Sequence, residues 1–178
     1  MKLTKNPKKE YSALINSIGS LLEQGRKKAY HAVNQILVKT YWNIGKQIVE
    51  YEQGGKEKAE YGSALLDNLS KDLKLKYGKG FSKSNVYLMR IFYLQYPKFQ
   101  TLSGKLSWSH YAELLSINED TSRQFYENQS LKENWSVREL KRQINSALFH
   151  RLALSKDKKG VIELSKNGIL ISTAKDIV

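Results

Sequence analysis

Residues 65–96 read LLDNLSKDLKLKYGKGFSKSNVYLMRIFYLQY, and this stretch decides the fold that we expect. Apolar residues recur in it at intervals of three and four, which predicts two helices, over about 61–77 and about 82–96. Between them, Gly78 suits the left-handed position that ends a helix, and Ser82 suits the N-cap of the next helix. Two helices joined by a short glycine-bearing link have the layout of a helix-turn-helix.

The predicted helix over 82–96 has two distinct faces. At 100° per residue, its large apolar residues gather on one face and its basic and hydroxyl-bearing residues on the other. The polar face suits DNA recognition, because Lys pairs with phosphate, Arg with a guanine edge and hydroxyls with either. Asn85 falls on the apolar face, so we expect it to bond to the backbone near the turn. We predict DNA contacts at Lys76, Lys79, Lys83, Ser84, Tyr87 and Arg90.

Helical periodicity also dominates the rest of the chain, which predicts an all-α bundle of about seven helices containing the helix-turn-helix or winged-helix-like unit. Gly25 is predicted to end the first helix. The pattern Ser136-Val137-Arg138-Glu139 is a capping box that opens the last helix. In the tail, 161–164 and 169–173 form a candidate β-hairpin around Asn167-Gly168. The other expected helices span about 10–24, 27–53, 109–115, 120–129 and 136–154.

The chain has 178 residues, no cysteine and a formal net charge of +13, from 30 Lys and Arg against 17 Asp and Glu. Without Cys there are no disulfides, thiolate metal sites or cysteine nucleophiles. The positive charge predicts a polyanion partner, nucleic acid first, although a basic surface can also serve solubility alone. No run approaches the ~20 apolar residues of a membrane span, and residues 1–9 lack the apolar core of a secretory signal. We therefore expect a cytoplasmic protein without a membrane partner.

Candidate catalytic groups are few, and each has a structural alternative. Glu139-Leu140-Lys141 spells the Glu-x-Lys of metal-dependent nucleases, but it lies in a predicted helix cap rather than on a strand. Within residues 106–111 a Ser beside His110 would form a nucleophile pair. A helix start with Ser107 or Ser109 as the cap, Trp108 in the core and His110 bonded locally explains the same residues. We expect no catalytic residue, metal site or cofactor in this chain. A second basic surface is predicted at Arg138, Lys141 and Arg142.

Several short motifs follow one another in a fixed order between residues 10 and 155. They are Tyr41-Trp42-Asn43-Ile44-Gly45-Lys46-Gln47-Ile48, Glu60-Tyr61-Gly62, Gly78-Lys79-Gly80-Phe81-Ser82-Lys83-Ser84-Asn85-Val86, Trp108-Ser109-His110-Tyr111 and Trp135-Ser136-Val137-Arg138-Glu139-Leu140. In this order they resemble the N-terminal domain of the YhcG family, bacterial proteins described as PDDEXK-type nucleases. The resemblance implies a helical DNA-binding module with its helix-turn-helix-like stretch at residues 81–93. It also implies a separate C-terminal nuclease domain that holds the catalytic residues and Mg²⁺.

These observations divide the chain into three parts and leave alternative roles open. Residues 1–9 are a flexible N-terminus, 10–155 a helical DNA-binding domain, and 156–178 a linker or hairpin toward a nuclease domain outside this sequence. The first hypothesis is that the domain binds duplex DNA for that nuclease, which predicts affinity that falls steeply with salt. The alternative is a protein-interaction or homodimerisation module of a defence or toxin–antitoxin system. A third hypothesis, a nuclease within this chain, predicts Mg²⁺-dependent cleavage by the isolated chain.

Overall fold

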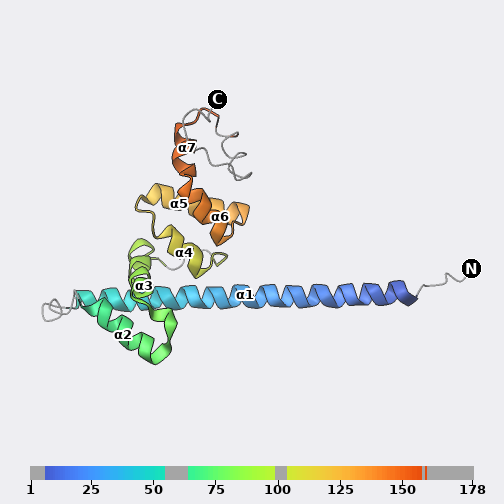
Figure 1. The fold of residues 1–178 in the computed structure, drawn as a ribbon, viewed down its shortest axis with the longest axis horizontal. Coiled ribbons are helices and arrows are strands. Elements are labelled where there is room, and N and C mark those ends of the chain that lie inside the picture. Colours follow the sequence, from blue (N-terminus) through green and yellow to red (C-terminus); the bar gives the residue numbers. More distant parts are fainter. Residues whose placement is uncertain (1–6, 55–63, 99–103, 158, 160–178) are drawn as a thin grey trace, which may run out of the picture.

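The computed structural model describes residues 7–54, 64–98, 104–157 and 159, and all regular structure in these residues is helical (Figure 1). The helices follow the chain in the order α1 Pro7–Gln53, α2 Leu65–Tyr77, η2 Lys79–Phe81, α3 Lys83–Gln95, α4 Trp108–Leu114, α5 Asp120–Glu133, α6 Val137–Asn145 and α7 Leu148–Leu154, where η2 is a 3₁₀ turn. The all-α fold class is confirmed over this part of the chain. The candidate hairpin at 161–173 lies outside it. None of the described helices has the apolar length that crossing a membrane requires.

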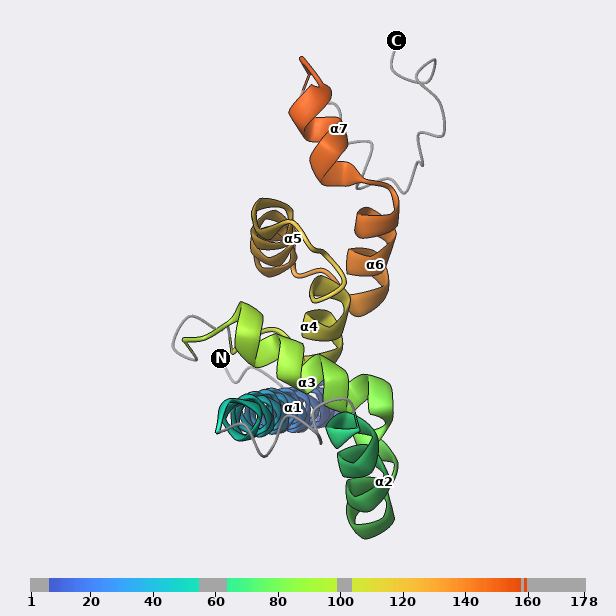
Figure 2. The same ribbon diagram turned by 90° about the vertical axis from the view of Figure 1, so that its left-hand side faces the viewer.

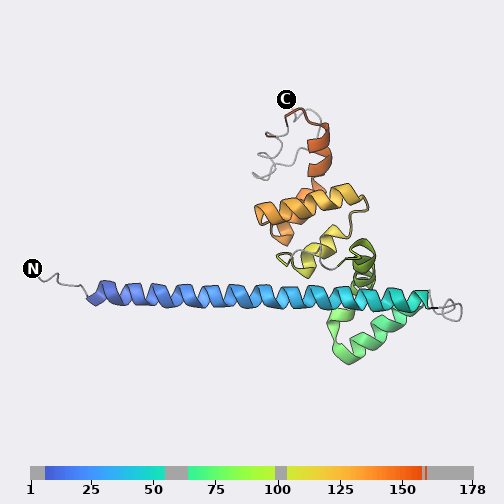
Figure 3. The ribbon, with the colours of Figure 1, turned by 180° about the vertical axis from the view of Figure 1, so that it is seen from behind.

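α1 is one continuous helix of 47 residues, about 70 Å long at 1.5 Å per residue. The predicted end of a first helix at Gly25 is therefore wrong. Gly25 lies inside α1, with nothing beyond its own helix within 4 Å of where a Cβ would stand. An exposed glycine costs a helix about 1 kcal/mol without removing a hydrogen bond, and no proline follows to force an end. In Figures 1 and 3 the N-terminal half of α1 extends away from the other described helices.

α3 packs on α1, and α4 contacts both of these helices through Trp108 (Figure 2). Val86, Met89 and Phe92 are completely buried on α3, which confirms the apolar face expected from the 100° spacing. α1 and α3 approach closely at Gly45, where a Cβ would stand 1.9 Å from the carbonyl oxygen of Met89. Since only glycine leaves room for this approach, Gly45 fixes the place where α3 crosses α1.

The core of the C-terminal half forms where α4, α5, α6 and α7 follow one another away from α3 (Figure 2). Tyr111 and Leu140 are completely buried there and belong to the same cluster as Phe92 of α3. The single last helix predicted over 136–154 is wrong. The chain is divided into α6 and α7 at Ala147, whose φ of 50° lies in the left-handed region.

The break between α6 and α7 leaves two backbone groups without their helical hydrogen-bond partners, and the hydroxyl of Tyr126 on α5 bonds to both of them. This hydroxyl donates to the carbonyl of Gln143 at 3.2 Å and accepts from the backbone N–H of Phe149 at 3.1 Å. In an uninterrupted helix both groups would bond to positions four residues away. Burial raises the pKa of the Tyr126 hydroxyl, which keeps the proton that it donates. A side chain from another helix thus overrides the local helical pattern.

Candidate nucleic-acid interface

The link between α2 and α3 consists of residues 78–82 and includes the 3₁₀ turn η2. Gly78 ends α2 with a φ of 92°, a conformation that favours glycine, and its N–H donates to the carbonyl of Lys74 at 2.9 Å. Ser82 begins α3, and its Oγ accepts from the backbone N–H of Asn85 at 3.2 Å. The predicted helix end at Gly78 and the predicted N-cap at Ser82 are both confirmed. The link is longer than the three or four residues usual in a helix-turn-helix.

Three side chains from different helices fix the shape of this link. Ser70 on α2 donates through its Oγ to the carbonyl of Phe81 at 2.9 Å. Asn85 on α3 donates through Nδ2 to the carbonyl of Gly80 at 2.5 Å, and its Oδ1 accepts from Nε1 of Trp108 on α4 at 2.8 Å. The prediction that Asn85 bonds to backbone near the turn is confirmed. Because these bonds tie the link to α2, α3 and α4, it can present its surface in one fixed shape.

Five of the six predicted DNA contacts lie exposed around this link. We call them the basic corner, which consists of Lys76, Lys79, Lys83, Ser84 and Tyr87. Nζ of Lys76 lies 5.4 Å from the ring centre of Tyr77. Nζ of Lys83 lies 2.7 Å from a carboxylate oxygen of Asp67, with 69% of the lysine side chain exposed. Ion pairs this exposed contribute at most about 1 kcal/mol, so phosphate can compete for the lysine.

Arg90, the sixth predicted contact, links α3 to α1. Its Nε donates to both carboxylate oxygens of Glu52, at 2.9 and 2.7 Å, and the side chains are only 28% and 21% exposed. Removing either partner would leave a half-buried charge without its counterion, which is costly. Contact of Arg90 with a guanine edge stays a prediction, and its replacement would disturb helix packing as well as any DNA contact.

The predicted second basic surface is made of side chains on α6. Arg138 is exposed. Nζ of Lys141 lies 3.4 Å from Oε1 of Glu113 on α4. Arg142 donates to both carboxylate oxygens of Glu139, at 3.0 and 2.5 Å. Two of the three basic groups therefore already have carboxylate partners, and this surface is less available for phosphate than the basic corner.

The start of α6 confirms Ser136 as the N-cap, the first half of the predicted capping box, whereas the Glu139 carboxylate bonds forward along α6. Oγ of Ser136 accepts from the backbone N–H of Glu139 at 3.2 Å, as the capping pattern predicts. The Glu139 carboxylate binds Arg142 and also accepts from Nε2 of Gln143 at 2.6 Å. Among the described residues, no three His, Asp or Glu side chains gather as they would to hold a metal ion. Glu139 acts here as a helix-stabilising group.

Replacing Glu139 by Gln is expected to weaken the fold at neutral pH and to flatten its acid sensitivity. The hydrogen-bonded guanidinium of Arg142 holds the pKa of the Glu139 carboxyl below its ordinary 4.5. The stability that the carboxylate adds is therefore present above pH 4.5 and is lost as pH falls through the lowered pKa. We expect a loss of about 1 kcal/mol at pH 7 that shrinks below pH 4.5. Urea unfolding from pH 7 to pH 3 measures it; a constant difference would contradict the assignment.

The Trp-Ser-His-Tyr motif at 108–111 joins α4 to its neighbours. Ser107 caps α4 and forms a capping box with His110. Nε2 of His110 lies 3.0 Å from the carbonyl of Trp135. A carbonyl can only accept, so Nε2 carries the proton and Nδ1 accepts from Ser107, whose Oγ lies 2.8 Å away. The local helix start was predicted, but the links from Trp108 to α3 and from His110 to the α5–α6 connection had no signal in the sequence.

A buried polar cluster that the sequence did not reveal joins the end of α3 to α5. The hydroxyl of Tyr96 donates to Oε2 of Glu127 at 2.9 Å. Burial raises the pKa of both groups. Arg123 lies over the Tyr96 ring, 5.8 Å from its centre, and donates to the carbonyl of Ile117 at 3.1 Å. A cavity of about 450 Å³ lies beside them. These residues are up to 31 positions apart, so spacing could not have identified them.

Comparison with known proteins adds one family and one relative. The family model described as "DUF1016 N-terminal domain" matches residues 17–151. A protein of Escherichia coli (strain K12) named "Putative nuclease YhcG" is 36% identical over 185 residues, which cover 86% of this chain and 49% of the relative. The chain therefore spans about half the length of the curated relative. No solved structure matches it.

Proposed function

The chain belongs to the DUF1016 N-terminal domain family, and from this premise we propose that it binds duplex DNA in the cytoplasm and positions it for a separate nuclease domain. The relative named as a nuclease is about twice as long as the matched region. In this proposal the nuclease activity and its Mg²⁺ belong to the part of such a protein that the chain does not cover. The basic corner carries the proposal.

The charge and shape of the basic corner support contact with a phosphate backbone. Between Leu65 and Gln95 there are six Lys and Arg against two acidic residues. Lys76, Lys79 and Lys83 stand exposed around a link that hydrogen bonds hold in one conformation. Neutralising phosphates with such lysines releases counterions from DNA, which drives binding at low salt. Ser84 and Tyr87 follow on the exposed face of α3 and bring hydroxyls to the same surface.

Replacing Lys79 and Lys83 together by Ala is expected to weaken DNA binding at least tenfold at low salt. The slope of log affinity against log salt should fall by about two, since each phosphate contact contributes about 0.9. The measurement is anisotropy of a labelled duplex and its single strand from 50 to 300 mM salt. These lysines are chosen over Arg90, because Arg90 also holds α1 to α3.

The matched control is Lys132→Ala with Lys156→Ala, which removes the same charge from exposed positions on α5 and after α7. It should leave the salt slope almost unchanged. An equal loss in both variants would mean that only net charge matters and would remove the basic corner as the site. No binding of the unmodified chain at the lowest salt would overturn the proposed function.

A second role, as a module that associates with itself, is favoured by α1. Its N-terminal half carries large apolar side chains in exposed positions, such as Tyr11 and Leu21 at 66% and 65% exposure. Soluble proteins rarely expose such a run of apolar surface without a binding role. The two roles are compatible, because the basic corner lies on other helices.

A further inference from the structure

α1 carries an exposed apolar line, which we call the stripe. At 100° per residue its members lie within about 60° of one another around the helix. Val38, Gly45 and Val49, which face the rest of the molecule, lie on the opposite side. No other described helix covers the stripe (Figures 1 and 3). It consists of Tyr11, Ile15, Ile18, Leu22, Val33 and Ile36, which are 44–66% exposed.

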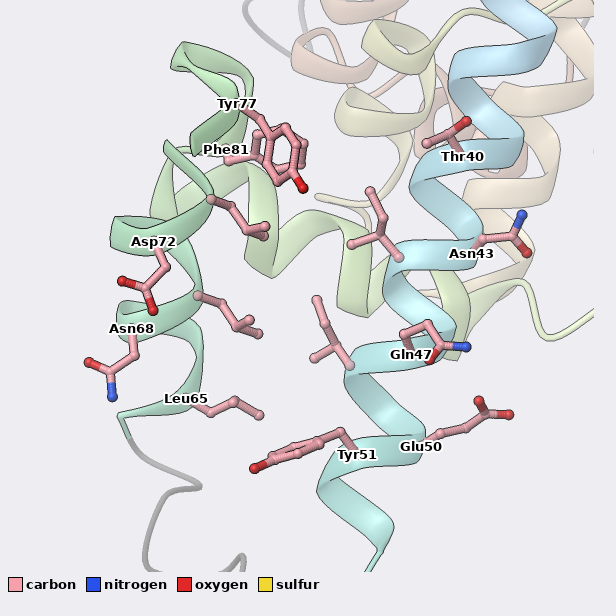
Figure 4. A pocket seen from close by; sticks show the side chains of 14 residues that line it. Thr40, Asn43, Gln47, Glu50, Tyr51, Leu65, Asn68, Asp72, Tyr77 and Phe81 are labelled. Carbon is pink, nitrogen blue, oxygen red and sulfur yellow. The ribbon is translucent and has the colours of Figure 1, made fainter. Parts of the chain in front are cut away.

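The stripe leads into an open groove between α1 and α2. The groove has a volume of about 1170 Å³ and runs along α1 from Thr40 to Tyr51. Ile44 and Leu69 are among the apolar side chains that line it. In Figure 4, Tyr51 of α1 and Leu65 of α2 point into the opening from its two sides, while the labelled polar side chains of α2 point away from it. The groove can therefore bury the apolar face of another helix.

We infer that the groove receives residues 11–22 of a second copy of this chain, so that two α1 helices pair in antiparallel directions. The groove and the inserted segment both span eleven residue steps, about 16 Å. In this register, residue numbers that face each other add up to 62. Tyr11 then faces Tyr51, and Ile18 faces Ile44. Each chain inserts its own segment and accepts its partner's, so the interface is two-fold symmetric and closed.

Charge favours the antiparallel arrangement over a parallel one. Arg26, Lys27 and Lys28 form a basic cluster near the middle of α1. Of these, Arg26 lies beside the stripe, so in a parallel pair the two Arg26 side chains would stand side by side and repel each other. In the antiparallel register Arg26 faces position 36 of the partner, which is Ile, and the two arginines are kept apart.

The available area suffices for a stable dimer. A half-exposed Leu, Ile or Tyr side chain offers roughly 100 Å². Stripe and groove together offer on the order of 1,000 Å² per chain, far more than the few hundred Å² usual for an apolar patch on a monomer. Two copies would bury on the order of 2,000 Å², at the upper end of the range for specific protein interfaces. This inference rests on the proposed self-association and is independent of the proposed DNA binding.

Sedimentation of the whole chain tests the stripe. We expect a dimer at micromolar concentration, and Ile18→Asp with Leu22→Asp should raise its dissociation constant at least a hundredfold. Both positions are exposed, so circular dichroism should show unchanged folding in the C-terminal helices. The control is Leu75→Asp, which removes a 90% exposed leucine of α2 outside the groove. A monomer at all concentrations would overturn self-association. A dimer whose dissociation constant is the same with and without the two aspartates would overturn the stripe as its interface.

Disulfide cross-linking tests the register, because the chain has no cysteine of its own. Ile18→Cys with Ile44→Cys should give a covalent dimer on mild oxidation. The two positions are about 39 Å apart within one α1, so the bond can form only between copies. Ile18→Cys with Leu75→Cys is the control and should remain uncross-linked. A dimer in which positions 18 and 44 do not cross-link would overturn the groove as the receiving site, while DNA binding is measured separately.

Discussion

Replacing Gly45 by Ala is expected to destabilise the protein by about 3 kcal/mol or more. The new Cβ would stand 1.9 Å from the carbonyl oxygen of Met89 and 3.2 Å from Cβ of Tyr93. The first contact is with backbone, which no rotamer change can relieve, so α1 and α3 must separate. The Arg90–Glu52 ion pair spans the same two helices and would be strained with them. The measurement is the free energy of unfolding from urea titrations followed by circular dichroism.

Gly19→Ala is the matched control for that experiment. It makes the same change in the same helix, at a position with nothing beyond its own helix within 4 Å. Alanine is the better helix former, so this variant should be more stable by about 0.5–1 kcal/mol. The two substitutions should therefore have opposite signs. A similar small gain at both positions would show that α1 and α3 do not approach as closely as the structure has them.

Replacing Phe92 by Ala is expected to cost about 3–5 kcal/mol. The ring of Phe92 is completely buried where α3 meets α4. Its centre lies 4.9 Å from that of Tyr111, and 5.4 Å from those of Trp108 and Tyr96. Alanine would leave a cavity among three aromatic side chains, which also lose favourable edge contacts. Thermal and urea unfolding measure the loss.

Leu94→Ala on the same helix provides the comparison for Phe92→Ala. Leu94 is 46% exposed, so its truncation should change stability by less than about 0.5 kcal/mol. Phe92→Leu, which keeps most of the volume, should fall between the two. If Leu94→Ala cost as much as Phe92→Ala, the orientation of α3 would be wrong, and with it the exposed face that the basic corner uses.

Local signals in the sequence predicted local structure well. Ser82 was identified as a cap from its residue type and position, and the hydrogen bond from Asn85 N–H confirms it. Asn85 was placed on the apolar face by its angle alone, and it does bond to the turn. Such predictions succeed because a cap or a helix face depends on residues within one or two turns of each other.

The wrong predictions concern structural features that depend on residues far apart in the sequence. Gly25 favours a helix end locally, yet the residues around it propagate the helix through it. Ala147 is a good helix former, yet the chain breaks there, where Tyr126 from α5 supplies the hydrogen bonds. Arg90 was expected to face DNA, and no local pattern pointed to Glu52, 38 residues away, as its partner. Contacts at such separations leave no periodic signal in a single sequence.

The uninterrupted length of α1 has a consequence for the kind of DNA site that two copies would recognise. The basic corner stands beside Tyr41, whose hydroxyl lies 4.0 Å from where a Cβ of Gly80 would be. In the proposed antiparallel register the partner's Tyr41 would stand level with Leu21, about 30 Å along the helix axis from the first chain's own Tyr41. One turn of B-DNA measures about 34 Å, so the two corners would match half-sites roughly one turn apart. A palindromic site with that spacing should bind more tightly than one with the half-sites moved by five base pairs, which places them on opposite sides of the duplex.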